Sequence, residues 1–192
     1  MTIYSWLILA LWLIFIAYWA LSAIGAKRNL SRRKWWREVG VRLIIIAIIL
    51  FALRLPVFNH PARHVHVYLL STTDARLGIA GVTLCALGVA LAIWARVYLG
   101  KNWGMPMSRK EHPELVTTGP YAYVRHPIYT GLLLAMFGSA IAETAFWLVP
   151  LVVVGAYFIY SARSEEKGMV EEFPERYPAY QKRTKILVPF LL

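Results

Sequence analysis

Long apolar runs are the feature that most constrains what this chain can fold into. Three of them cover about residues 3–24, 39–58 and 76–99, and two more follow at about 128–142 and 144–160. A hydrocarbon core of about 30 Å needs roughly 20 helical residues to cross it, and a backbone inside lipid must satisfy its own hydrogen bonds. A soluble core could not cover several such runs. We therefore predict an all-α, polytopic membrane protein with about five transmembrane helices.

The charges between the runs predict the orientation in the membrane. Segments 25–38, 100–126 and 163–192 contain 6, 4 and 6 of the 21 Lys and Arg residues, whereas the intervening loops contain only Arg63. Cytoplasmic loops carry the excess of positive charge, so we expect the N-terminus outside and the C-terminus in the cytoplasm. The net charge is +11, and we expect anionic lipid headgroups rather than nucleic acid to be the partner of the basic segments. Because the chain is compact, we place it in a prokaryotic cytoplasmic membrane.

The last two apolar runs meet across Glu143 and Thr144 with almost no loop, which predicts a tight C-terminal helical hairpin. The fourth run is short for a full crossing, so four spans plus a re-entrant pair are the alternative. The hairpin returns the end of the fifth run to the start of the fourth. We divide the chain into an N-terminal three-helix membrane region, 1–99, and a C-terminal catalytic region, 100–192, which form one integrated domain.

Polar residues interrupt the apolar pattern just before the fourth run. Gly and Pro at 119–120 are a turn signal, and Pro127 fits the first turn of a helix. Arg125 and His126 then lie at the positive N-terminal end of that helix, an end that suits an anionic group. Tyr129 follows His126 at i+3 and shares its face.

A second polar group, Arg163 with Glu165 and Glu166, follows the fifth run. Charged residues at a membrane boundary often serve only as anchors, and for Glu166 that interpretation is as good as a functional one. Glu165 is favoured because the hairpin brings it beside the start of the fourth run. A carboxylate, an imidazole, an arginine and tyrosine hydroxyls would then converge on a polar ligand that carries both signs of charge. The sequence therefore predicts a cytoplasmic site for such a ligand.

Several short motifs in this region occur together in a recognisable order. Leu-Val-x-x-Gly-x-Tyr-x-x-x-Arg-His-Pro-x-Tyr at 115–129 precedes the hairpin, Glu-Glu follows it, and a Phe-x-x-x-Tyr-x-x-Tyr tail ends at Tyr180. This order resembles the isoprenylcysteine carboxyl methyltransferase family over about residues 100–189. The resemblance implies S-adenosylmethionine as methyl donor, bound on the cytoplasmic side. The candidate cofactor-binding residues are Glu114, Leu115, Val116, Gly119, Tyr121, His126, Pro127, Tyr129, Glu165 and Glu166.

Two positions depart from the family's pattern. Relatives often have a histidine or lysine where this chain has Glu114, and an arginine thought to approach the substrate where it has Ser161. The candidate catalytic residues are Arg163, Glu165 and Arg125. An arginine would orient an acceptor carboxylate by a bidentate contact. With an amine acceptor, a carboxylate or His126 would have to take a proton instead, and the sequence leaves both chemistries open.

The most favoured function is carboxyl O-methylation of an isoprenylcysteine-like or other lipophilic substrate, either a small molecule or a prenylated protein. A phospholipid N-methyltransferase is the first alternative. An NADPH-dependent sterol-type membrane reductase is the second, but Gly131 is followed by Leu132 rather than the Glu common in that group. His60, His64 and His66 lack an accompanying Cys or carboxylate cluster, so we predict no metal site.

Overall fold

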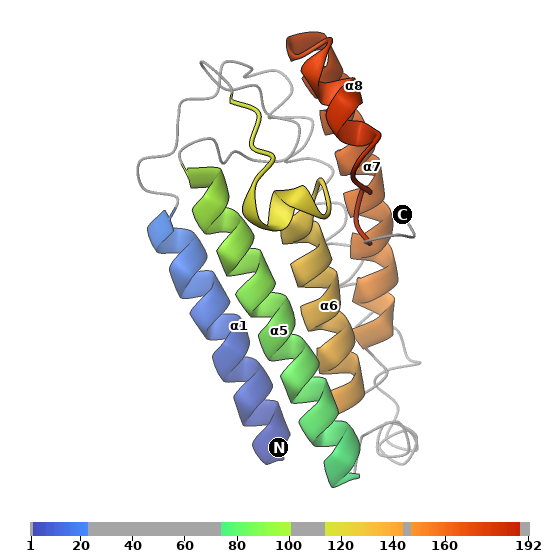
Figure 1. Cartoon of the computed structure of the whole chain (residues 1–192). Helices are drawn as coiled ribbons and strands as arrows, with labels where there is room; N and C mark the ends of the chain where they lie inside the picture. Colours follow the sequence, from blue (N-terminus) through green and yellow to red (C-terminus); the bar gives the residue numbers. More distant parts are fainter. Residues whose placement is uncertain (1, 23–73, 101–113, 144–146, 189–192) are drawn as a thin grey trace.

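The computed structural model describes residues 2–22, 74–100, 114–143 and 147–188 (Figure 1). The described part of the chain has no β-strand and one isolated parallel bridge, between Val124 and Lys185. The all-α prediction is confirmed there, while the predicted run 39–58 and the three loop histidines lie outside the described residues. The elements are α1 (Ile3–Ser22), α5 (Ala75–Leu99), the 3-10 helix η3 (Gly119–Ala122), α6 (Pro127–Ala142), α7 (Leu148–Glu172) and α8 (Arg176–Gln181).

Two of the described helices, α1 and α5, are long and apolar enough to cross a bilayer. Their 20 and 25 residues correspond to about 30 and 37 Å of helix. Helix α6 is also apolar but has 16 residues, or about 24 Å. Its length agrees with the short fourth run in the sequence.

Local signals set both ends of α5. The side chain of Asp74 accepts a hydrogen bond from the backbone N–H of Arg76 at 2.8 Å and caps the first turn. Gly100 follows the last turn with φ 53°, and its N–H donates to the carbonyls of Arg96 and Val97. This left-handed conformation suits glycine, so α5 ends here.

Paired glycines hold α5 and α6 together. Gly81 on α5 faces Gly138 on α6, and Gly88 faces Gly131, so a Cβ added at any of the four would overlap the partner's backbone. In lipid, helices associate through van der Waals contact between closely approaching backbones rather than through the hydrophobic effect. The α5–α6 pair is therefore the closely packed centre of the described bundle.

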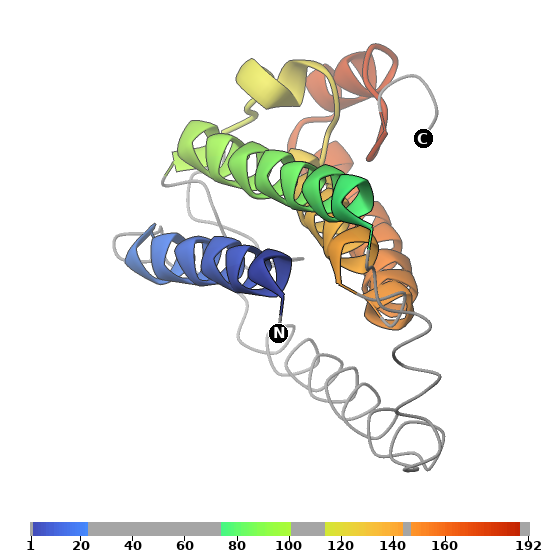
Figure 2. The same cartoon turned by 90° about the horizontal axis from the view of Figure 1, so that it is seen from below.

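Helix α1 packs on this pair through aromatic side chains. The ring of Tyr4 covers Gly78, and Trp12 Nε1 donates to Ser139 Oγ at 3.1 Å. Ile8 is the one described α1 residue that is buried. Figure 2 shows α1 and α7 on opposite sides of the α5–α6 pair. The side of α1 that faces away from the pair is exposed.

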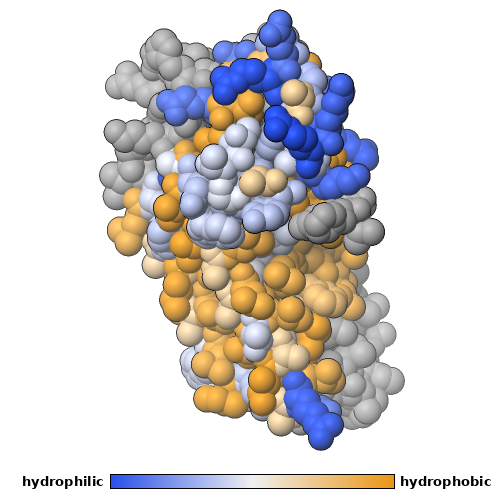
Figure 3. All heavy atoms as spheres, viewed as in Figure 1, coloured by the Kyte–Doolittle hydropathy of each residue, from blue (hydrophilic) through white to orange (hydrophobic). Residues whose placement is uncertain are grey.

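The exposed surface of the helices is apolar. Hydrophobic residues cover most of the face made by α1, α5 and α6, and hydrophilic residues gather around α8 (Figure 3). Leu21 and Val152, for example, are each 70% exposed. Apolar patches of this extent are rare on soluble monomers, whereas lipid chains would cover them in a bilayer.

Helix α7 runs antiparallel to α6 and is longer than its apolar part. The sequence pattern predicted that the fifth apolar run ends at residue 160, with a charged tail from 163. The structure adds that the charged residues continue the same helix, which extends to Glu172. Residues with straight side chains, such as Glu, Lys and Met, favour helix, so α7 continues beyond its apolar part. Arg163, Glu165 and Glu166 therefore lie within this helix.

Candidate functional site

The polar residues predicted to act together lie around the N-terminal end of α6. The Gly-Pro turn forms η3, and Gly119, at φ 59°, packs on the ring of Tyr98. Pro127 is the first residue of α6 and is fully buried. Arg125 and His126 consequently stand directly before α6, as the sequence predicted.

A segment near the C-terminus fixes the backbone at this point. We call residues 181–187 the carboxyl-terminal strap. The N–H of Arg125 donates to the carbonyl of Lys185 at 2.8 Å, and the N–H of His126 donates to the carbonyl of Ile186 at 3.0 Å. Thr130 Oγ1, one turn into α6, donates to the carbonyl of Leu187 at 2.5 Å. The strap thus holds two consecutive candidate residues in place.

Three aromatic rings are stacked beneath the site. The rings of His126 and Tyr129 are 5.4 Å apart and inclined by 6°, which confirms their shared helix face. Tyr129 stacks in turn on Phe158 of α7, at 4.3 Å and 8°. The stack restrains the imidazole and joins the start of α6 to α7.

Glu165 is the most exposed charged residue of the cluster. Its Oε1 accepts hydrogen bonds from the hydroxyl of Tyr129 at 2.6 Å and from Ser161 Oγ at 3.2 Å. Its Oε2 lies 3.7 Å from His126 Nδ1. The Glu165 side chain is 26% exposed, more than twice the value for Arg125, His126 or Glu166. Among these four residues, Glu165 is the one that a ligand reaches most easily.

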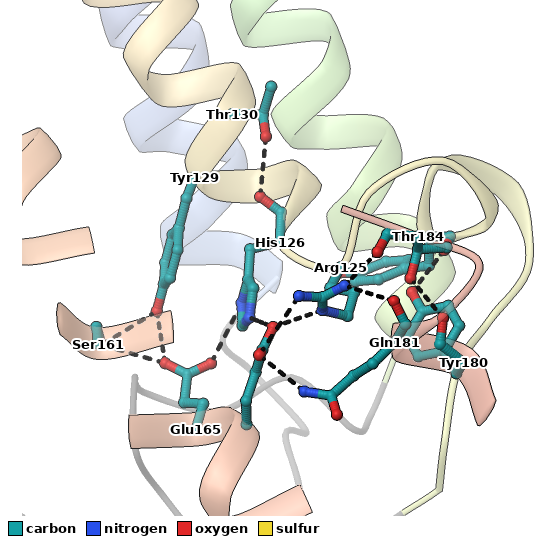
Figure 4. Close-up of polar contacts among 11 residues, drawn as sticks. Arg125, His126, Tyr129, Thr130, Ser161, Glu165, Tyr180, Gln181 and Thr184 are labelled. Atoms are coloured by element: carbon teal, nitrogen blue, oxygen red, sulfur yellow. Dashed lines mark hydrogen bonds and ion pairs between the residues drawn. The ribbon is translucent and has the colours of Figure 1, made fainter. Parts of the chain in front are cut away.

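Glu166 forms a buried ion pair with Arg125. Figure 4 shows Arg125 between His126 and the residues Gln181 and Thr184. Arg125 Nε donates to Glu166 Oε1 at 2.5 Å, and Gln181 Nε2 donates to Oε2 at 3.0 Å. Arg125 Nη1 also donates to the carbonyls of Gln181 and Thr184. The guanidinium therefore joins the start of α6, the end of α7 and the strap.

The electrostatics of the site follow from this pairing. Burial alone would raise the pKa of Glu166, but the neighbouring His126 and Arg125 outweigh it and lower the pKa to about 2. Burial raises the pKa of Tyr180 to about 12 and that of Tyr121 well above its ordinary value. At neutral pH, Glu166 is ionised and both tyrosines are neutral hydroxyls.

The imidazole of His126 lies between two carboxylates. Its Nε2 is 3.5 Å from Glu166 Oε1 and is buried, with no hydrogen-bond partner among the described residues. Such buried unsatisfied groups are uncommon in folded proteins and call for an explanation. A ligand beside Glu165 would lie next to this ring.

Other candidate residues are placed differently. Arg163 is exposed, and its position two residues before Glu165 turns it by about 200° around α7. Glu114 is exposed, while Leu115 and Val116 are half-buried ahead of η3. Ser161, noted in the sequence only as a departure from the family pattern, contacts both Tyr129 and Glu165.

The sequence pattern missed the contribution of the strap. The motif tail was recognised up to Tyr180, whose hydroxyl donates to the carbonyl of Tyr121 at 2.5 Å. Gln181 follows directly and Thr184 three residues later, and the backbone carbonyls of both accept from Arg125. The polar side chain of Gln181 next to the motif could have indicated a contact, but its partner, Glu166, lies in a different helix.

The sequence model of the phospholipid methyltransferase family matches residues 77–176, just over half of the chain. The nickel-cobalt-cadmium resistance protein NccN of Alcaligenes xylosoxydans xylosoxydans is 26% identical over 171 residues, which are 88% of this chain and 72% of the relative. Protein-S-isoprenylcysteine O-methyltransferase B of Arabidopsis thaliana is 32% identical over 119 residues, 58% of each chain. The solved structure of the eukaryotic intramembrane Ras methyltransferase ICMT superposes with a TM-score of 0.56 at 20% identity, covering 84% of this chain and 55% of that one.

Proposed function

Because the chain belongs to the phospholipid methyltransferase family, we propose that it is an integral membrane enzyme that transfers a methyl group from S-adenosylmethionine to a lipophilic acceptor. The family match favours methyl transfer over the hydride transfer of a sterol-type reductase. The observation that carries the proposal is the cluster at the start of α6, where His126 and Tyr129 meet Glu165 of α7.

The cluster fits a donor that carries both signs of charge. The accessible carboxylate of Glu165 would bind the donor's ammonium group or ribose hydroxyls. His126, with the backbone N–H groups of the first turn of α6, would meet its carboxylate. Tyr121 and Tyr129 would line the pocket. The position of His126 Nδ1, 3.7 Å from Glu165 Oε2, supports this fit.

The bound donor supplies a methyl group that is already activated as a sulfonium. The protein then has to align the acceptor behind this methyl group and exclude water, and positioning of this kind supplies up to about 7–11 kcal/mol in favourable models. Arg125 is bound to Glu166 and to two carbonyls of the strap, so it contributes by holding the site together. Glu165, the most exposed of the four charged residues of the site, is then the one closest to the bound donor.

We propose an isoprenylcysteine-like carboxylate as the acceptor. The similarity to the Arabidopsis thaliana isoprenylcysteine methyltransferase supports this choice. A phospholipid headgroup amine is the second candidate, and the description of the matching family supports it. An amine would need a proton acceptor, and Glu165 is the accessible carboxylate of the site.

We place the site on the cytoplasmic side, with the N-terminus outside. Exposed basic side chains on α8 and the strap support this orientation, because cytoplasmic segments carry the excess of positive charge. They are Arg176, Lys182, Arg183 and Lys185.

Calorimetric titration of the detergent-solubilised protein with S-adenosylmethionine tests the donor site. We expect Glu165→Gln and His126→Ala to weaken binding at least tenfold. Glu172→Gln, at an exposed position two turns further along α7, should bind like the wild type. Wild-type affinity in both site variants would overturn the assignment. Transfer of labelled methyl groups to farnesylcysteine analogues or to phosphatidylethanolamine vesicles then separates the two acceptors.

A further inference from the structure

Both oxygens of the Glu166 carboxylate are held, but by different residues. Oε1 accepts from Arg125 Nε at 2.5 Å. Oε2 accepts from Gln181 Nε2 at 3.0 Å and from Arg125 Nη2 at a longer 3.4 Å. The terminal torsion of a glutamate is broad, so a carboxylate anchored well at one oxygen can still rotate. Gln181 supplies the shorter contact to Oε2 and thereby fixes the plane of the carboxylate.

The orientation of this plane matters because Glu166 Oε1 also faces His126. The distance to His126 Nε2 is 3.5 Å, while Nδ1 on the other side of the ring faces Glu165. The strap fixes the backbone of His126, and the ring is stacked on Tyr129. The imidazole therefore lies between two carboxylates, and a shift of either one would change the electrostatic field that orients the ring.

We propose that Gln181 is a positioning residue for donor binding: it aligns Glu166 with His126 and so orients the imidazole that meets the donor. The inference rests on the proposed function, since the donor is S-adenosylmethionine. Gln181 is the last residue of α8, and its amide acts on His126 through Glu166. In this proposal α8 and the strap contribute to donor binding, because they hold Gln181 in place beside Glu166.

The chemistry of the amide explains why glutamine suits this position. Its NH₂ group donates to a carboxylate without adding charge, so it does not compete with the Arg125–Glu166 ion pair. An ionised carboxylate at the same position would repel Glu166, and only its protonated form could donate a hydrogen bond. Gln181→Glu therefore converts a fixed contact into one that depends on pH.

Other titratable and charged groups also face this position. Arg125 and His126 precede α6, Glu165 lies on α7, and Tyr177 and Tyr180 lie on α8. The wild type and Gln181→Glu share all of these groups. A difference between their pH profiles therefore reports on the introduced carboxyl group.

The experiment is calorimetric titration with S-adenosylmethionine at pH 5.5 and pH 8, on full-length protein in detergent, with the folded fraction measured by size exclusion. We expect Gln181→Met to bind about tenfold more weakly at both pH values, the size expected for loss of a hydrogen bond to a charged group. Gln181→Glu should bind weakly at pH 8 and recover toward the wild type at pH 5.5. The control Lys182→Met changes the exposed neighbouring residue and should match the wild type.

Two results would overturn the positioning role of Gln181. Donor binding by Gln181→Met that equals the wild type, or a pH profile of Gln181→Glu parallel to that of the wild type, would overturn the positioning role. If Gln181→Met does not fold, the pH comparison on Gln181→Glu still decides. Absence of donor binding by the folded wild type would instead overturn the proposed function, together with the inference that depends on it.

Discussion

Removal of the Arg125 guanidinium should destabilise the protein more than removal of any exposed arginine. The side chains of Arg125 and Glu166 are only 8% and 10% exposed, so Arg125→Met leaves a buried, ionised carboxylate without its cation. Breaking a buried pair in this way costs about 3–5 kcal/mol. For a chain of this length we expect a fall in melting temperature on the order of 10 °C.

Thermal unfolding in detergent, followed by tryptophan fluorescence, measures this effect. Arg183→Met is the matched control, because Arg183 is exposed and its side chain donates one long hydrogen bond, to the carbonyl of Ala179 at 3.4 Å. Its effect should stay within about 0.5 kcal/mol. The double variant Arg125→Met/Glu166→Met should regain much of the loss, since no unpaired charge remains. The reasoning fails if Arg125→Met behaves like the control, or if the double variant is no more stable than Arg125→Met alone.

Three further predictions follow from the described contacts. The folded-state pKa of Glu166, about 2, lies below its ordinary value of 4.5. The ionised carboxylate therefore stabilises the fold by up to about 3 kcal/mol above pH 4.5, and this stabilisation is lost as the pH falls toward 2. The melting temperature of the wild type should show this decline, and a similar decline in Glu166→Gln would contradict it. Gly88→Ala should destabilise the bundle by more than about 2 kcal/mol, because the added Cβ would overlap the backbone of α6. Gly155→Ala should unfold like the wild type, because its added Cβ would meet only Leu133, at 3.6 Å. Tyr180→Phe should lose about 1 kcal/mol with its hydrogen bond to Tyr121, and equal melting temperatures for Tyr180→Phe and the exposed-site variant Tyr123→Phe would refute this.

Much of the fold was predictable because its signals are local. Apolar runs mark α1, α5 and α6 whatever their neighbours are, since the need to satisfy backbone hydrogen bonds in lipid acts on each segment separately. Pro127 marks the start of α6, and the i+3 spacing places His126 and Tyr129 on one face. The end of α7 was less predictable, because its charged residues suit a helix as well as a tail.

The site was predictable only in part, because its contacts join residues far apart in the sequence. The hairpin indicated that Glu165 approaches the start of α6, and the structure places it beside His126 and Tyr129. No local pattern showed that Arg125 would pair with Glu166 rather than face an acceptor. Gln181 was marked only by its place beside the motif tail, and its partner Glu166 lies 15 residues away in another helix.

The sequence by itself determined the membrane environment, the helical class and the order of the motifs, because periodicity, apolar length and charge bias are properties of single segments. The tertiary structure decided which charged groups are paired and which are accessible. Arg125 is held by Glu166 and the strap, while the side chain of Glu165 is 26% exposed. That distinction depends on burial and distance, which arise only when α6, α7 and the carboxyl-terminal strap pack together.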